Sequence, residues 1–236
     1  MITLKDVKND PEIKQLISSA NHVLSVIGYT EHGPRHVGYV SRTSAEILKE
    51  LGYDERTVEL AAIAGWVHDV GNAVNRDFHG VTGAQLIYHI LVQRGMPYNE
   101  VCKIISAVGN HEERNGRAVS EISAALILAD KSDAHRTRVH RGQYDPADIH
   151  DRVNYAIRDN KLIVNREQMI IRYDVQMDDT SSILEFMQIY LTRMRMSEAA
   201  AKYLGCRFQF VVNDVVVNNL MDVDEAPAQG VVIEGE

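Results

Sequence analysis

Apolar residues recur every three or four positions through the first two thirds of the chain, which is the spacing of one buried helical face. Pro34 and Pro97 stand where two of these segments begin. Gly52, Gly71 and Gly95 stand where three of them end. The pattern predicts one or two helices in residues 1–28, followed by helices over residues 34–51, 54–70, 79–94, 97–111 and 120–141.

From about residue 160 the pattern changes to an alternation of apolar and polar residues, which is typical of strands. Residues 161–167 and 168–177 are predicted to be two strands joined by a short turn, and residues 208–218 a hairpin. Between them, residues 180–205 read as an amphipathic helix with a Ser/Thr start and a glycine stop. An acidic stretch with Pro and Gly follows from Met221 and predicts a disordered tail.

These elements predict a mainly α protein in three parts. Residues 1–158 are expected to form a helical bundle, residues 159–220 a small α+β domain of order β-β-α-β-β, and residues 221–236 the disordered tail. A second subunit could cover the edges of the small sheet, so a homodimer is one hypothesis.

Charge and length exclude some classes of function. The chain has 236 residues and a formal net charge of -8, whereas a protein that coats nucleic acid needs a basic face. No stretch approaches the roughly 20 apolar residues that cross a bilayer, and the first residues are too polar for a signal peptide. The two cysteines, Cys102 and Cys206, lie in apolar runs and do not predict a disulfide. We therefore expect a cytoplasmic protein that neither coats nucleic acid nor binds a membrane.

Side chains that bind metals occur in predicted helices that are otherwise apolar: His36, His68, Asp69, His111 and Asp130. An unpaired charge in a core is costly, whereas imidazoles and carboxylates around a divalent ion are satisfied by it. The pattern therefore predicts a metal site. The alternative is a set of hydrogen-bonded core histidines and helix-terminal carboxylates. For Asp69 this alternative is less favourable, because a carboxylate near a helix C-terminus opposes the helix dipole.

The adjacent pair His68-Asp69 is the sharpest feature of this pattern. Neighbours on a helix diverge by about 100°, so the two side chains could serve different sides of one metal cluster. Gly71 lets the backbone turn away directly afterwards. Imidazole and carboxylate ligands suit Mn, Fe, Co, Ni and Zn better than Mg, and all six metals stay open. We expect one or two divalent metal ions.

Three short motifs resemble those of the HD superfamily of metal-dependent phosphohydrolases. They are Arg35-His36, His68-Asp69 and the aspartate of LILADKSDA, Asp130, which follow the H…HD…D signature of that superfamily. The resemblance covers roughly residues 20–140. It implies an all-helical fold in which four residues bind a first metal: His36, His68, Asp69 and Asp130.

The closer similarity is to HD domains with two metals, such as those of the HD-GYP type. Their pattern continues as HDxGK, HxxxG and HHExxDG, and the matching segments here are HDVGN (68–72), HGVTG (79–83) and NHEERNG (110–116). The resemblance implies that His79 and His111 bind a second metal and that Asp69 bridges the pair. Asn72 stands in the place of the lysine, and Asn110 in the place of one histidine.

The implied chemistry is hydrolysis of a phosphoester by metal-activated water. Asp69 and Lys131 are the candidate catalytic residues, Asp69 to orient the water and Lys131 to hold the phosphate. The candidate substrate-binding residues are Arg35, Asn72, Lys131, His135 and Arg138. The alternative for the basic run from His135 to Arg141 is a solvated helix face.

Three functions remain open from the sequence. The first is a metal-dependent phosphohydrolase that acts on a nucleotide or another small phosphorylated metabolite. The second is a non-catalytic nucleotide-binding sensor that uses the α+β unit to transmit a signal or to dimerise, and Asn72 and Asn110 motivate it. The third is an oxygenase with two irons, because some histidine-rich HD proteins resemble mixed-valent di-iron oxygenases.

Overall fold

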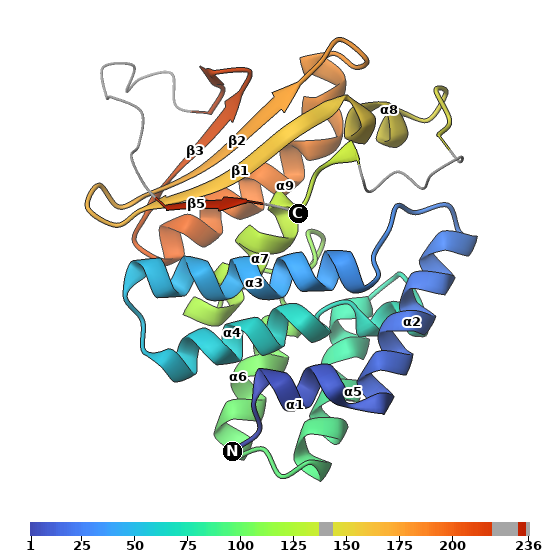
Figure 1. Ribbon diagram of the computed structural model, residues 1–236, viewed down its shortest axis with the longest axis vertical. Helices are drawn as coiled ribbons and strands as arrows, with labels where there is room; N and C mark the ends of the chain where they lie inside the picture. The colour runs from blue at the N-terminus through green and yellow to red at the C-terminus, as the bar shows by residue number, and fades with distance from the viewer. Residues whose placement is uncertain (137–143, 219–230, 235–236) are drawn as a thin grey trace.

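The computed structural model describes residues 1–136, 144–218 and 231–234. Within these residues, helices form the lower part of the molecule in Figure 1 and a five-stranded sheet with one long helix forms the upper part. The helices that precede the sheet are α1 (Leu4–Asn9), α2 (Pro11–Val26), α3 (Pro34–Leu51), α4 (Glu55–Val67), the short 3-10 helix η1 (Val70–Ala73), α5 (His79–Gln93), α6 (Tyr98–Gly109), α7 (Glu121–Ser132) and α8 (Ile149–Ala156). The predicted fold class, mainly α with a small α+β unit after the helices, is confirmed.

Polar caps define where the central helices begin. Asp54 accepts hydrogen bonds from the backbone N–H groups of Arg56 and Thr57, at 3.1 and 3.0 Å, and so starts α4. Ser120 caps α7 in the same way through the N–H of Ser123. These caps satisfy amide groups that the helix itself leaves without partners, which fixes the chain positions at which both helices begin.

A glycine lets α3 and α4 pack closely. A Cβ atom at Gly65 of α4 would lie 2.7 Å from the Cα atom of Ser41 in α3, so only a residue without a side chain fits. Beside it, the Ser41 hydroxyl donates a hydrogen bond of 2.7 Å to the carbonyl of Ala62. The close crossing brings together the helix that contains His36 and the helix that His68 follows.

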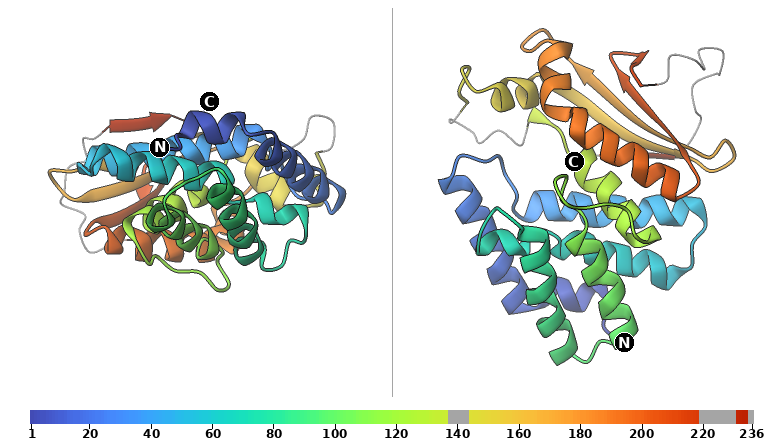
Figure 2. Two further views of the ribbon diagram at one scale, coloured as in Figure 1. Left: turned by 90° about the horizontal axis from the view of Figure 1, so that it is seen from below. Right: turned by 180° about the vertical axis from the view of Figure 1, so that it is seen from behind.

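The sheet is mixed. Its strand order is β4-β3-β2-β1-β5, where β2 (Ile170–Met177) and β3 (Arg207–Val212) are parallel and the other pairs, which involve β1 (Ile157–Asn165), β4 (Val215–Val216) and β5 (Val231–Glu234), are antiparallel. Helix α9 (Ile183–Tyr203) connects β2 to β3 and lies across one face of the sheet, as the view from behind in Figure 2 shows. A stack of buried aromatic rings joins helix and sheet: Tyr173, Phe186, Tyr190 and Phe210.

Three local predictions are wrong. The helix predicted to run through residue 141 ends at Ser132, because the next residue, Asp133, leaves the helical conformation and binds groups on α3. The short helix α8 was not predicted; Asp148 caps its start. Of the tail predicted to be disordered, residues 221–230 and 235–236 lie outside the described residues, whereas residues 231–234 form strand β5, which pairs with β1.

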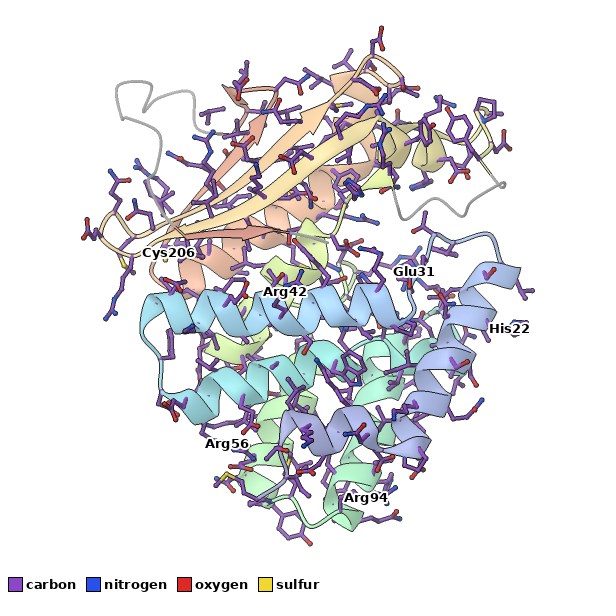
Figure 3. All side chains as sticks on the ribbon, in the orientation of Figure 1. His22, Glu31, Arg42, Arg56, Arg94 and Cys206 are labelled. Atoms are coloured by element: carbon purple, nitrogen blue, oxygen red, sulfur yellow. The ribbon has the colours of Figure 1, made fainter. Side chains whose placement is uncertain are left out.

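Ion pairs tie the surface of the helical part together. The Arg56 guanidinium binds Glu100 of α6, and the Arg94 guanidinium binds Asp10 at the start of α2; both arginines are labelled in Figure 3. The buried apolar side chains of the described helices and strands form a continuous core. Among the described helices, none combines the length and the apolar character needed to traverse a bilayer.

Candidate metal centre

Six predicted ligands from separate segments converge on one point of the helical part. His36 lies in the first turn of α3, and His68 and Asp69 follow the last residue of α4. His79 is the first residue of α5, His111 follows α6, and Asp130 lies in the last turn of α7. The four imidazoles and Asp69 are buried, and the Asp130 side chain is 14% exposed.

One half of the centre joins α3, α4 and α7. The Nε2 atoms of His36 and His68 are 3.2 Å apart. Asp69 Oδ2 lies 3.6 Å from His36 Nε2 and 3.5 Å from His68 Nε2. Asp130 Oδ1 lies 3.5 and 3.7 Å from the same two nitrogens. Two nitrogens and two carboxylate oxygens thus face a common point.

The other half of the centre joins α5 and the end of α6. The Nε2 atoms of His79 and His111 are 3.0 Å apart. Here it is the other oxygen of Asp69, Oδ1, that approaches them, at 3.3 Å from His79 and 3.7 Å from His111. Asp69 therefore presents one oxygen to each half.

The second ring nitrogen of each histidine fixes the tautomer. Nδ1 of His68, His79 and His111 donates to the backbone carbonyl three residues earlier, at 2.6–2.9 Å. Nδ1 of His36 donates to Asp133 Oδ2 at 2.6 Å. A neutral imidazole carries one proton, so in the neutral rings all four Nε2 atoms present lone pairs to the centre.

This donor set fits a divalent cation. Lone pairs that face each other at 3.0 and 3.2 Å repel unless a cation lies between them. Two nitrogens that each lie about 2.1 Å from one ion are about 3.0–3.4 Å apart, which agrees with both separations. Metal-binding histidines usually donate their other N–H to a carbonyl or a carboxylate, as all four do here. The residues could therefore hold one ion in each half.

The charges of the centre agree with its use as a ligand set. Burial alone raises the pKa of Asp69, but the neighbouring His68, His111 and His79 side chains lower this pKa well below its usual range. Asp130 behaves in the same way: burial opposes ionisation, and the Lys131 ammonium lowers the carboxyl pKa. Burial lowers the pKa of His111 to about 4. At neutral pH the carboxylates are ionised and His111 is neutral, as metal binding requires.

Glycines bring the two halves close together. A Cβ atom at Gly71 of η1 would lie 1.9 Å from the carbonyl oxygen of His79, so the segment after Asp69 passes directly over the start of α5. Gly80 donates its N–H to Glu112 Oε1 at 2.5 Å. The same carboxylate oxygen lies 3.3 Å from His79 Nδ1. These contacts fix His79 relative to Asp69.

A cavity of about 260 Å³ opens beside the centre. Its wall includes Asp69, His79, His111 and Asp130 together with side chains of both signs of charge. The predicted phosphate ligand Lys131 lies on this wall, where its ammonium binds Asp130 Oδ2 at 2.6 Å and Glu113 Oε1 at 3.0 Å. Two carboxylates thus already neutralise Lys131.

Three other predicted substrate-binding residues, Arg35, Asn72 and His135, do not line this cavity. Arg35 forms a forked pair with Asp133, at 2.8 and 3.2 Å, and a bond to Glu31 at 3.1 Å; Figure 3 labels Glu31 before α3. Asn72 supports the centre instead, because its Nδ2 donates to Asp69 Oδ1 at 2.9 Å. His135 contacts the carbonyl of Arg158. Arg138 lies outside the described residues.

Residues at the site that were not predicted include Arg76, Glu112, Glu113, Asp133 and Arg193. Asp133 follows Asp130 by one helical turn, and this spacing was the one available signal for it. Glu112 directly follows His111 in a polar loop, and Arg193 lies in an ordinary amphipathic helix. Position Asn110 lies away from the cavity, since its Nδ2 donates back to the carbonyl of Ser106.

Replacing Asp133 by alanine is expected to weaken metal binding. The carboxylate accepts the Nδ1–H of His36, and losing such a partner of a metal-binding histidine reduces metal affinity by about 10–100-fold. Titration of the metal-free protein with Mn²⁺ or Zn²⁺ measures the change. The matched control is Glu31→Gln, which removes the other carboxylate partner of Arg35. Equal affinity of Asp133→Ala and the parent protein would contradict this role.

Comparison with known proteins agrees with the site. Residues 34–136 match the HD domain family model. A ribonuclease Y of Mycoplasma mycoides is 31% identical over 138 residues, which cover 57% of this chain and 30% of that protein. A ribonuclease Y of Campylobacter jejuni is 34% identical over 137 residues, with 57% and 24% covered. The chain thus spans less than a third of the length of these relatives.

A further relative matches over a longer stretch. An uncharacterized protein of Methanocaldococcus jannaschii is 23% identical over 197 residues, which cover 72% of this chain and 74% of that protein. All six converging side chains, from His36 to Asp130, fall inside the range of the HD family match. The predicted resemblance to the HD superfamily is therefore confirmed for residues 34–136, which match the HD domain.

Proposed function

We propose that this protein is a phosphohydrolase that uses one or two divalent ions held by six residues: His36, His68, Asp69, His79, His111 and Asp130. One observation carries the proposal: four imidazole Nε2 atoms, each with its Nδ1 hydrogen-bonded to an acceptor, converge on the two oxygens of a single carboxylate. The HD family, whose members are generally metal-dependent phosphohydrolases, supports the same activity.

A bound divalent ion at this centre supplies a water of lowered pKa and neutralises charge on a phosphoryl group. The protein's own residues orient the reaction. Asp69 is ionised and buried, so it can orient a water molecule by accepting a hydrogen bond from it. Asn72 fixes the Asp69 carboxylate through its amide. Asp69 is therefore the proposed catalytic residue, and Lys131, paired with Asp130, the proposed electrostatic support.

Arg76 is the proposed phosphate ligand beside the second half of the centre. It lines the cavity, and its Nη1 lies 3.4 Å from His79 Nε2 and 3.3 Å from Asn72 Oδ1. The Tyr29 ring supports the guanidinium from one side, with its centroid 5.1 Å from Cζ. A guanidinium there can bind phosphoryl oxygens in a forked geometry.

The proposed substrate is a small phosphoester, either a nucleotide or another phosphorylated metabolite. The cavity volume of about 260 Å³ is suited to a phosphoryl group with a small organic part. The names of the ribonuclease Y relatives support nucleotide phosphodiesters as candidate substrates. A short panel of nucleoside monophosphates, nucleoside diphosphates and dinucleotides covers this range.

The deciding experiment measures phosphate or nucleotide release from this panel with Mn²⁺, Fe²⁺, Co²⁺, Ni²⁺, Zn²⁺ and Mg²⁺, before and after chelation. We expect turnover that is lost with chelator and restored by the metal. No turnover of any compound under any metal would reject hydrolysis. Tight nucleotide binding without turnover would instead favour the non-catalytic sensor, and oxygen consumption by the iron-loaded protein would favour an oxygenase.

A further inference from the structure

The α+β part of the chain reaches into the HD site through helix α9. Ile189 and Arg193 are four residues apart and so share one face of α9, and both line the cavity that Asp69 and Asp130 line. Helix α9 packs against α7, the helix that contains Asp130. Seen from behind in Figure 2, α9 runs diagonally above α7.

Arg193 has an open hydrogen-bonding capacity at this position. Its Cζ lies 4.8 Å from the centroid of the Tyr190 ring, which supports the guanidinium from one side. Its Nε lies 3.6 Å from Glu113 Oε1, which is an ion pair without a hydrogen bond. In the part of the chain that the structure describes, this guanidinium donates no hydrogen bond. Only 29% of the Arg193 side chain is exposed, so most of it is also shielded from water. A largely buried guanidinium with five N–H donors is suited to bind an oxyanion.

The neighbouring cation Lys131 differs in this respect. Its ammonium binds Asp130 at 2.6 Å and Glu113 at 3.0 Å, so two carboxylates balance one positive charge. Within the described residues, Arg193 forms its ion pair with Glu113, at 3.6 Å. The sequence of contacts from Asp130 through Lys131 and Glu113 to Arg193 also sets Arg193 apart from the metal-facing oxygens. Among the described residues, these contacts give Arg193 an ion pair with Glu113 and none with a residue of the centre.

We propose that Arg193 binds a second anionic group of the substrate, so that the site selects compounds with two phosphoryl groups over compounds with one. This inference rests on the proposed phosphohydrolase function and names its substrate class. One phosphoryl group lies at the metal centre, and the second lies against the α9 face of the cavity, where the forked guanidinium donates hydrogen bonds to it. The α+β part then contributes to specificity as well as to the fold.

The test compares two probes that the protein does not hydrolyse. Calorimetry of the metal-loaded full chain, freed of unbound metal, gives the affinity for inorganic phosphate and for methylenediphosphonate, which carries two phosphonyl groups on a stable P–C–P bridge. We expect the parent protein to bind methylenediphosphonate more tightly. Arg193→Gln is expected to weaken methylenediphosphonate binding about 10-fold or more and to change phosphate binding less than about twofold, since one charge-assisted contact is lost.

Two further variants sharpen the test. Arg193→Lys keeps the charge without the fork and is expected to keep part of the preference. Arg195→Gln, at an exposed position of the same helix, is the matched control and is expected to behave as the parent. Circular dichroism and metal content of each variant show whether the fold and the centre are intact.

The outcomes separate this inference from the proposed function. Equal weakening of both probes by Arg193→Gln, no weakening of either, or a parent protein without the preference overturns the inference. Arg193-dependent binding of methylenediphosphonate without turnover of any phosphoester supports the inference and rejects hydrolysis. Turnover of nucleoside monophosphates and diphosphates that Arg193→Gln leaves unchanged rejects the inference and leaves hydrolysis standing.

Discussion

Replacing Asp69 by asparagine is expected to remove most of the bound metal and to lower phosphoester turnover by about 1,000-fold or more, which is about 4 kcal/mol of transition-state stabilisation. Each carboxylate oxygen faces one half of the centre, at 3.3–3.7 Å from its two imidazole nitrogens. An amide of the same shape keeps one neutral oxygen and turns its NH₂ toward the other half, where no ion can use it as a ligand.

Elemental analysis of protein purified without chelator measures this effect. Loss of two equivalents of metal per chain in Asp69→Asn supports two metal ions bridged by Asp69, and loss of one equivalent supports a single metal ion. The control is Asp159→Asn, which removes an exposed carboxylate that pairs with Lys161 on β1. Unchanged metal content together with unchanged turnover in Asp69→Asn would remove Asp69 from the ligand set.

Replacing Gly71 by alanine is expected to destabilise the protein by about 3 kcal/mol or more, because backbone atoms cannot yield to the added methyl group. The Cβ atom would lie 1.9 Å from the carbonyl oxygen of His79 and 2.6 Å from the amide nitrogen of Gly83. Helix α5 would therefore have to move away from η1, and His79 would move with it. For a chain of this size the melting temperature should fall by about 6–12 °C.

Thermal denaturation of metal-free protein isolates this packing effect from metal binding. Gly38→Ala is the matched control, since its Cβ would meet only a Trp66 ring carbon at 3.8 Å, an ordinary contact. Alanine at a mid-helix position such as Gly38 is expected to raise stability slightly. A Gly71→Ala protein that melts with the parent would show that η1 and α5 are not packed as described.

The convergence of the candidate ligand side chains could be predicted because polar residues are unusual at the buried positions that they occupy. His36, His68 and Asp130 are polar residues at apolar positions of buried helices, and the structure places them in one group within reach of a single ion. Their spacing in the chain carries this signal without any knowledge of how the helices pack.

The supporting residues gave a weaker signal or none. Arg193 lies in a helix whose polar stripe is like that of any amphipathic helix, and its position at the cavity depends on how α9 packs against α7. Arg35 was predicted to bind substrate, but a partner 98 positions away, Asp133, takes its guanidinium. Sequence spacing reports which residues share a face of one helix, whereas these roles depend on contacts between elements that are distant in the chain.

The prediction of the fold shows the same difference between local sequence pattern and long-range contacts. The helices over residues 34–132 could be predicted from their apolar faces and from the Pro, Gly and Ser residues at their ends. Strand β5 is a four-residue segment that needs a partner strand to form, and its composition next to an acidic, Pro-containing stretch favoured disorder. Short segments whose stability comes from pairing are therefore the elements that a local pattern misses.

The hydrogen bonds of the four imidazoles differ in their range along the chain. Three rings are oriented from within their own segment, since each bonds the carbonyl three residues before it. The fourth ring, that of His36, is oriented by a residue 97 positions away, at the end of α7. The orientation of three rings is thus fixed by the local backbone, whereas the orientation of the His36 ring is fixed by the tertiary structure. Any shift of α7 against α3 alters the orientation of His36 and leaves the other three rings aimed as before.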